Sequence, residues 1–244
     1  FFKQKTAYEI YQCDWSSDVC SSDLQIDSFV SALKLFKEPV FHPAKASVYE
    51  ELGIWAQKYD RKDLALACAQ AASDTDEAEA EFNRMCIGPY RLTVPPYESV
   101  WRTGRRVLNN RFSAAVQYSY EEIGLAVGDM NEPVDFFGYE LEFCYATHAF
   151  ASAYEKEGKT QEAELLREAA SRFWAEHLGH WAGKFLEAMQ QDARHPFWRA
   201  WAQALSELLT VQHKDIALSN TMSGEETTAV VQPPRSLHGT KDSI

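Results

Sequence analysis

Residues 132–143, EPVDFFGYELEF, constrain the fold most strongly, because a stretch of turn residues passes there into an almost wholly apolar helix. Pro133 suits the first turn of a helix, where its missing N–H would have had no partner, and Asp135 can face the exposed N–H groups. From Val134 to Tyr154 apolar side chains fall on nearly every helical face, as in a helix surrounded by other helices. The stretch therefore predicts a buried central helix that begins near Pro133.

Apolar residues at helical spacing predict further helices on both sides of this one. Their predicted ranges are 25–36, 44–59, 62–72, 73–87, 113–125, 160–181 and 195–214. Between them lies a long connection in which Pro95-Pro96 precludes a helix and fixes an extended segment that carries Tyr97 and Trp101. With no convincing strand and 45% apolar residues in 244, the chain is predicted to be all-α. We expect a single compact bundle of about eight or nine helices with a long Pro-containing loop.

The two ends of the chain differ from this bundle, so we divide it into three parts. Residues 1–24 are polar, lack a helical apolar period and closely resemble translated sequencing-adapter read-through. We expect them to be a non-native segment that replaces the true N-terminus and packs poorly. Residues 25–218 form the predicted helical domain, and the Ser, Thr, Gly and Pro content of residues 219–244 predicts a disordered tail. Excluding the first part leaves Cys68, Cys86 and Cys144, an odd, widely spaced set typical of reduced cytosolic thiols.

Composition and missing motifs exclude several classes of function. A net charge of −12 disfavours nucleic acid, whose phosphates recruit basic patches, and suits a cationic partner. The sequence has no run of about twenty apolar residues and opens on no secretory leader, so we expect a cytoplasmic protein without stable membrane insertion. Phosphate-loop, dinucleotide-binding, nucleophile-elbow and HExxH motifs are missing, which predicts a non-enzyme without a cofactor. Cys144 and His148 could hold a metal, but their spacing suggests no third ligand and we predict no metal site.

Several polar and aromatic side chains have both a structural and a binding interpretation. As a first-turn acid, Asp135 would stabilise its own helix by about 0.3–1 kcal/mol. A carboxylate such as Glu140 or Glu142 on a mostly apolar helix must meet water, a cation or a hydrogen-bond donor. Tyr97 and Trp101 can either plug the loop onto the core or contact a ligand. The residues alone leave these alternatives open.

Four sequence blocks, taken together and in order, resemble a known family. They are EFNRMCIGP at 81–89, PPYESVW at 95–101, EPVDFFGYELEF at 132–143, and HLGHW with HPFWRAWAQAL within 177–205. They resemble the TorD/DmsD/NarJ redox-enzyme maturation chaperones over residues 26–212, and most closely the DmsD-like branch. The resemblance implies an all-helical, non-catalytic cytoplasmic chaperone that binds the twin-arginine signal peptide of a molybdenum-cofactor oxidoreductase of the DMSO-reductase type. Such a chaperone delays export of the oxidoreductase until the cofactor is inserted.

The resemblance also implies a peptide pocket. Carried over by position, it comprises Phe82, Met85, Pro96, Tyr97, Asp135 and Phe136, and the loop residue Trp101 is a further candidate contact. The chain departs from the family branch at two of these positions, with Tyr97 in place of a typical Trp and Phe136 in place of a typical His. We hypothesise that Asp135 accepts an arginine of the leader, while Tyr97 and Phe136 cover its apolar residues.

Two other classes of function remain as alternatives. One is a helical protein that handles the molybdenum cofactor itself, with Arg102, Arg105 and Arg106 as the only candidates for a phosphate-binding cluster; a solvated loop is the simpler interpretation of these residues. The other is a generic helical interaction scaffold. The expected partners of the chaperone are the twin-arginine leader and, additionally, the mature part of a molybdoenzyme catalytic subunit, and we expect a monomer or a homodimer.

Overall fold

The computed structural model describes residues 2–4, 26–89, 91–127 and 132–224 of the chain. The chain divides into two compact units, Phe1–Leu209 and Thr210–Ile244, and the boundary falls within the last helix. The arrangement and the site described below belong to the first unit.

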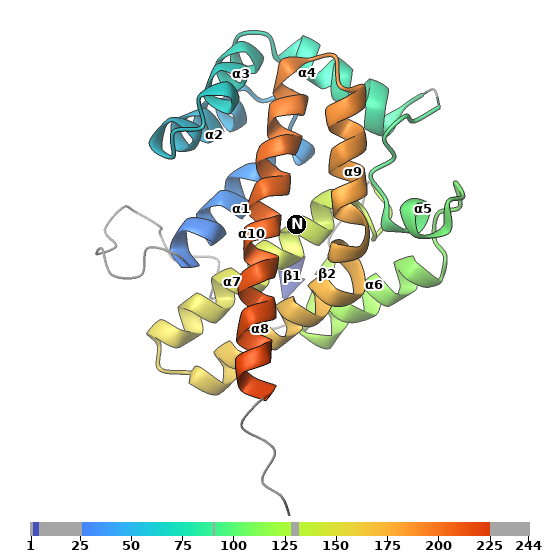
Figure 1. Ribbon diagram of the computed structural model, residues 1–244. Helices are drawn as coiled ribbons and strands as arrows, with labels where there is room; N and C mark the ends of the chain where they lie inside the picture. Colours follow the sequence, from blue (N-terminus) through green and yellow to red (C-terminus); the bar gives the residue numbers. More distant parts are fainter. Residues whose placement is uncertain (1, 5–25, 90, 128–131, 225–244) are drawn as a thin grey trace, which may run out of the picture. The chain divides into compact units, whose positions relative to one another are not determined.

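Helices make up most of the described structure, which confirms the predicted all-α class (Figure 1). In chain order they are α1 (Ile26–Phe41), α2 (Ala46–Lys58), α3 (Lys62–Ser73), α4 (Thr75–Phe82), α5 (Glu98–Thr103), α6 (Arg111–Glu122), α7 (Phe137–Lys156), α8 (Thr160–Phe173), α9 (Gly179–Asp192) and α10 (Pro196–Gly224). Two π-helical turns, η2 (Asn83–Ile87) and η3 (Trp174–Leu178), prolong α4 and join α8 to α9. The long loop between η2 and α6 therefore contains one short helix, α5.

Helix α7 is surrounded by other helices, as its apolar faces predict. It packs against α1 and α8, and its buried side chains extend from Phe137 to Ala151. Its start differs from the prediction, because Pro133 lies ahead of the helix and Phe136 is an N-cap in an extended conformation. Asp135 and Phe136 pair with the Pro-containing loop instead of turning into helix.

The core of the first unit is rich in aromatic side chains. Trp181, Trp198 and Trp201 are among the largest fully buried residues, and burying a large apolar side chain stabilises a fold by about 1.5–3 kcal/mol. The indole N–H groups also find acceptors, since Trp198 donates to the carbonyl of Ala78 at 2.8 Å and Trp201 to the carbonyl of Phe36 at 3.0 Å. These bonds tie the first half of α10 to α4 and α1.

The structure adds detail at both ends of the chain. A short antiparallel pair of strands that the sequence did not predict joins β1 (Phe2–Gln4) to β2 (Leu125–Val127). Residues 2–4 of the N-terminal segment are thus paired, whereas the expectation of poor packing for the rest of residues 1–24 lies outside the described residues. Helix α10 continues to Gly224 and so includes residues 219–224, which the sequence analysis assigned to the tail; residues 225–244 lie outside the described part.

Candidate functional site

The Pro-containing loop and the residues ahead of α7 meet in a short antiparallel bridge. Tyr97 lies opposite Phe136, the N–H of Phe137 donates to the carbonyl of Pro96 at 2.8 Å, and the N–H of Glu98 donates to the carbonyl of Asp135 at 3.1 Å. Pro96 can accept but not donate a main-chain hydrogen bond, so its extended conformation suits this one-sided pairing. The bridge brings together four of the predicted site residues: Pro96, Tyr97, Asp135 and Phe136.

An aromatic cluster forms around Phe136. Its ring centroid lies 6.1 Å from that of Tyr97, 6.1 Å from that of Phe41 and 5.5 Å from that of Tyr139. Gly138 makes room for it, because a Cβ at this position would lie 2.7 Å from Phe136 Cε1 and 2.9 Å from Phe41 Cζ. Phe136 and Tyr139 are buried and Phe41 is half-buried, so the cluster reaches the surface on the side of α1. We call these four rings the aromatic cluster.

Asp135 precedes Phe136 in the bridge and is fully buried. Its Oδ2 accepts the main-chain N–H of Ser99 at 2.8 Å, and its Oδ1 accepts the hydroxyl of Ser113 at 3.0 Å. Asp135 therefore does not cap its own helix; it stabilises the first turn of α5 and joins α5 to α6. Because its side chain has no exposed surface, a guanidinium could reach it only if α5 moved.

Glu132 is the carboxylate at the edge of the aromatic cluster. It is half-buried, and its Oε2 accepts the hydroxyl of Tyr97 at 2.6 Å. The pKa of this hydroxyl is raised above its usual value, mainly by burial and then by the bond to Glu132, so Tyr97 stays a donor at neutral pH. Tyr97 thus fixes the Glu132 carboxylate beside an apolar wall.

A second set of buried polar groups lies below α5. Glu98 is fully buried; its Oε1 accepts from Arg102 at 2.9 Å and its Oε2 lies 3.0 Å from His177 Nδ1. Glu140 accepts the indole N–H of Trp181 at 3.0 Å. Burial, and next the Glu98 carboxylate, raises the pKa of Glu140 well above its usual range, so its neutral form is favoured. These groups connect α5, α7, η3 and α9 and hold the loop in place.

Glu142 has a different partner, the buried lysine of α1. Its Oε2 lies 2.8 Å from Lys37 Nζ, which also contacts Glu38 at 2.6 Å, and the Lys37 ammonium lies 5.2 Å from the centre of the Tyr145 ring. The charge of the buried Glu142 carboxylate is therefore balanced by the Lys37 ammonium of the same chain. This ion pair ties α1 to α7 next to Phe41.

The remaining predicted site residues pack into the core. Phe82 stacks on Trp198 with ring centroids 4.7 Å apart, and the buried Met85 accepts the main-chain N–H of Val94 at 3.0 Å. Trp101 is half-buried; its indole N–H donates to the carbonyl of Pro95 at 2.6 Å, and its ring meets Phe185 edge-on.

These contacts show how far the structure brings the predicted residues together. Met85 and Trp101 hold the Pro-containing loop through their bonds to Val94 and Pro95. Phe82 stacks on Trp198 of α10 within the same core cluster. Sequence reasoning missed Phe41, Tyr139 and Glu132 as neighbours of the bridge. Of these, Glu132 and Tyr139 had a signal, their place in the block at 132–143, whereas Phe41 lies outside all four blocks.

Neither a metal site nor a membrane span emerges from the described residues. No three His, Cys, Asp or Glu side chains among them are grouped closely enough to hold an ion. His148 Nδ1 bonds to the carbonyl of Cys144 at 2.7 Å, and burial raises the pKa of the Cys144 thiol, which fits packing. Within the same residues no helix has the length and apolar character needed to cross a bilayer.

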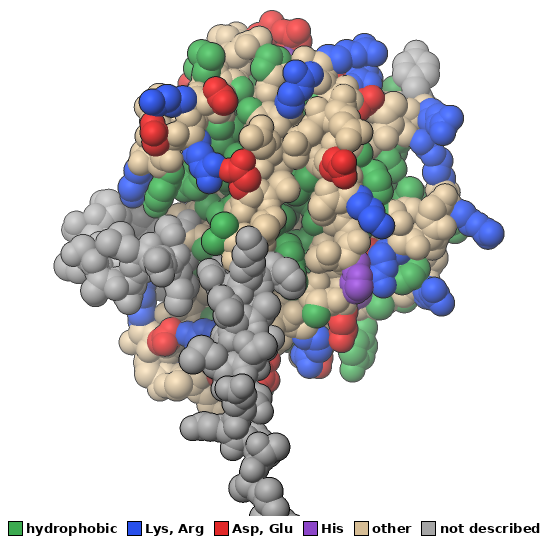
Figure 2. Space-filling model, in the orientation of Figure 1, with side chains coloured by type: hydrophobic (Ala, Val, Ile, Leu, Met, Phe, Trp, Pro, Cys, Tyr) green, Lys and Arg blue, Asp and Glu red, His purple; other side chains and the backbone are tan. Residues whose placement is uncertain are grey.

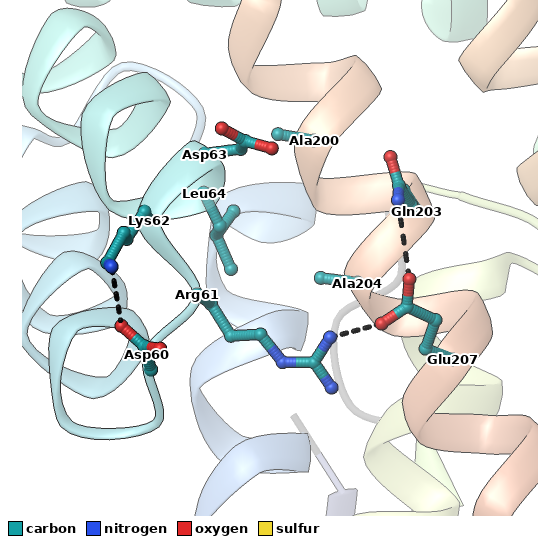
Figure 3. A pocket seen from close by; sticks show the side chains of 9 residues that line it. All are labelled: Asp60, Arg61, Lys62, Asp63, Leu64, Ala200, Gln203, Ala204 and Glu207. Carbon is teal, nitrogen blue, oxygen red and sulfur yellow. Dashed lines mark hydrogen bonds and ion pairs between the residues drawn. The ribbon is translucent and has the colours of Figure 1, made fainter.

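A separate hollow lies between the α2–α3 turn and α10 (Figure 3). It is lined by Asp60, Arg61, Lys62, Asp63, Leu64, Ala200, Gln203, Ala204 and Glu207. Its charged groups largely satisfy one another, since Arg61 contacts Glu207, Gln203 donates to Glu207 at 3.3 Å and Lys62 lies 3.4 Å from Asp60. It contains none of the predicted site residues.

Comparison with known proteins places this arrangement in a family. The family model described as nitrate reductase delta subunit matches residues 55–187, which is more than half of the chain. The chain belongs to the nitrate reductase delta subunit family. The matched range contains the bridge, Glu132 and Asp135, whereas Phe41 and Lys37 precede it.

Curated relatives and a solved structure agree with the delta subunit assignment. The chain is 31% identical over 146 residues to the Tat proofreading chaperone DmsD of Salmonella typhi, covering 59% of this chain and 65% of the relative. It is 26% identical over 155 residues to the chaperone protein YcdY of Escherichia coli, covering 64% of this chain and 73% of that one. The chain thus spans just under two thirds of the length of DmsD. A redox enzyme maturation protein from Archaeoglobus fulgidus has the same fold, with a TM-score of 0.52, 16% identity, and coverage of 80% of this chain and 99% of that chain.

Proposed function

We propose that the chain is a cytoplasmic, non-catalytic maturation chaperone that binds the twin-arginine leader of a molybdenum-cofactor oxidoreductase of the DMSO-reductase type and delays export until the cofactor is inserted. The family assignment and the names of the relatives support a chaperone of redox enzymes. A leader of this kind combines two arginines with an apolar stretch, so its receptor needs a carboxylate next to apolar surface.

One observation supports the location of the site: the Glu132 carboxylate is fixed by the Tyr97 hydroxyl at the edge of the aromatic cluster. A guanidinium can pair with the part of this carboxylate that Tyr97 leaves free, and the planar group can also lie against an aromatic face. The apolar residues of the leader would follow the side of Phe41 and Phe136. In this proposal Glu132 receives an arginine.

Asp135 then has a positioning role. By bonding Ser99 and Ser113 it holds the start of α5, and with it the extended segment that presents Tyr97. Pro96 contributes the carbonyl that the N–H of Phe137 requires. Met85 and Trp101 support the loop from below, and Phe82 supports the core behind it. The predicted pocket residues are thus proposed to shape the site: the half-buried Phe41 would meet the apolar residues of the peptide first, and the buried Tyr97 and Phe136 would form the wall behind it.

The test is calorimetric titration with a synthetic twin-arginine leader and its Lys-Lys variant. Glu132→Gln should weaken binding of the arginine peptide about five- to tenfold at low salt. It should also reduce the preference of the protein for the arginine peptide over the lysine peptide, because a carboxylate can form paired hydrogen bonds with the guanidinium of arginine but not with the ammonium of lysine. Glu50→Gln, an exposed glutamate on α2, is the matched control and should bind like the wild type. Unchanged arginine preference in Glu132→Gln would contradict the assignment of Glu132.

A further inference from the structure

The segment that carries Tyr97, between η2 and the start of α6, is also rich in arginine. Residues 84–111 contain six arginines and a single carboxylate, Glu98, in a chain whose net charge is −12. Glu98 is buried and already paired with Arg102, and Arg84 pairs with Glu81 and Asp192. The other four, Arg91, Arg105, Arg106 and Arg111, are exposed, and within the described residues none of them has an ion-pair partner.

Arg91, Arg105 and Arg106 lie on loops and Arg111 begins α6, and these segments are held together. The Arg106 guanidinium donates to the carbonyl of Leu92, which fastens the turn after α5 to the segment that follows η2. The same turn is fixed internally, because Asn110 donates to the carbonyl of Val107 at 3.0 Å and its side chain caps α6 by accepting the N–H of Phe112 at 2.9 Å. The charges therefore occupy an ordered surface.

Two apolar side chains lie among these charges. Val107 is 53% and Leu108 42% exposed, directly after Arg105 and Arg106 in the chain. Figure 2 shows Lys and Arg side chains gathered along the edge of the molecule where α5 and its flanking loops lie in Figure 1. We call this surface, made of Arg91, Arg105, Arg106 and Arg111 with Val107 and Leu108, the arginine face.

We infer that the arginine face docks an acidic surface on the folded body of the client enzyme, while the leader occupies the site at Glu132; this inference rests on the proposed function. Arginines around a small apolar centre are the composition of a protein–protein contact. Carboxylates on a partner would pair with guanidinium groups that meet no carboxylate in the described part of this chain.

The same observations favour a protein over a larger polyanion. The net charge of −12 repels an extended anionic surface such as a membrane or a duplex, whereas a local patch can act within the screening distance of about 8 Å. The exposed apolar residues of the arginine face, Val107 and Leu108, are aliphatic, and the Phe112 ring beside Arg111 is half-buried, unlike the exposed Trp and Tyr side chains that anchor proteins at a membrane interface. Two oppositely charged sites would thus let one chaperone hold both the cationic leader and the acidic body of one client.

The test uses the full chain and its double charge reversal Arg105→Glu/Arg111→Glu. Arg111 is the first residue of α6, where a glutamate also suits the helix dipole, so this variant should fold. Lys45→Glu/Lys62→Glu is the matched control, because both lysines are exposed and lie at the starts of α2 and α3. Arg105→Glu alone, in an exposed loop, keeps the test valid if the double variant does not fold.

Three probes are titrated onto each protein. The first is a leader peptide that the chain binds, and the second is the cofactor-free catalytic subunit of the same client, expressed without that leader. The third is vesicles of phosphatidylglycerol and phosphatidylcholine. We expect the arginine variant to bind the leaderless subunit about tenfold more weakly, with leader affinity unchanged and the lysine control unaffected. Equal affinity of variant and wild type for the leaderless subunit overturns the inference, and so does a loss confined to vesicle binding. Failure of the wild type to bind any leader would instead refute the proposed function, and this inference with it.

Discussion

Asp135→Ala tests whether the bridge between the loop and α7 depends on the buried carboxylate. The substitution leaves two buried donors without an acceptor, the main-chain N–H of Ser99 and the hydroxyl of Ser113. Each unpaired buried group costs about 1–3 kcal/mol. The Ser113 hydroxyl can rotate to another acceptor, but the Ser99 N–H is fixed at the start of α5.

We therefore expect Asp135→Ala to lower the free energy of unfolding by about 3–5 kcal/mol. Asp135→Asn keeps the shape and one acceptor oxygen, but its amide places a donor against a donor, so a loss of about 1–3 kcal/mol is expected. Both losses are large compared with the total stability of about 5–15 kcal/mol of an ordinary domain.

The assay is equilibrium unfolding in urea, followed by the fluorescence of the buried tryptophans. A double-mutant cycle with Ser113→Ala isolates the bond between the two side chains and should give a coupling free energy of about 1–2 kcal/mol. A loss below about 0.5 kcal/mol for Asp135→Ala, or strictly additive effects in the cycle, would refute the structural role assigned to Asp135.

Binding measurements on Asp135→Asn and Glu132→Gln show whether Asp135 holds α5 in place or contacts the leader peptide itself. If Asp135 acts through α5, folded Asp135→Asn should bind the leader more weakly but keep the salt dependence of the wild type, because the charge that meets arginine is Glu132. Loss of the salt dependence in Asp135→Asn, with Glu132→Gln unaffected, would restore the alternative in which Asp135 itself receives the arginine.

Three further substitutions probe the surroundings of the site. Gly138→Ala should destabilise the fold by about 1–2 kcal/mol in urea unfolding and weaken leader binding, since its Cβ would displace Phe136; unchanged stability would contradict the close approach. Glu140 has a raised folded pKa, so wild-type stability should fall as pH rises above about 4.3, by up to about 1.4 kcal/mol per pH unit until that pKa is reached. In Glu140→Gln this pH dependence of the free energy of unfolding should be absent. If the difference in that free energy between wild type and Glu140→Gln were the same at pH 5 and at pH 8, the raised pKa of Glu140 would be contradicted. Lys37→Met should cost about 3–5 kcal/mol by leaving Glu142 buried and unpaired, most of it recovered in Lys37→Met/Glu142→Gln.

The sequence predicted most of the helices because their signals are local. Apolar spacing located α1 to α4, α6, α8 and α10, whereas α9 was not predicted as a separate helix, because the predicted helix 160–181 covers only its first turn. Pro95-Pro96 located the extended segment that becomes one side of the bridge. The start of α7 was misplaced by four residues, because local signals do not report pairing with a distant segment. Pro133 and Asp135 are favourable at a helix start, but pairing with a segment about 36 residues earlier in the chain prevailed.

The roles of individual acidic residues could not be predicted in this way. Asp135 and Glu132 differ little as sequence signals, yet one is fully buried and bonded to Ser99 and Ser113, while the other is half-buried beside Tyr97. Which of them can meet a ligand depends on burial, and burial is set by partners far away in the chain. The same holds for Phe41, whose ring reaches Phe136 from the end of α1.

The most direct test of the central claim is titration of the chain with a twin-arginine leader peptide and its Lys-Lys variant at low and at physiological salt. The account predicts binding that depends on the arginines, weakens with salt and is reduced in Glu132→Gln. A correctly folded chain that binds several such leaders no better than their Lys-Lys variants would contradict it.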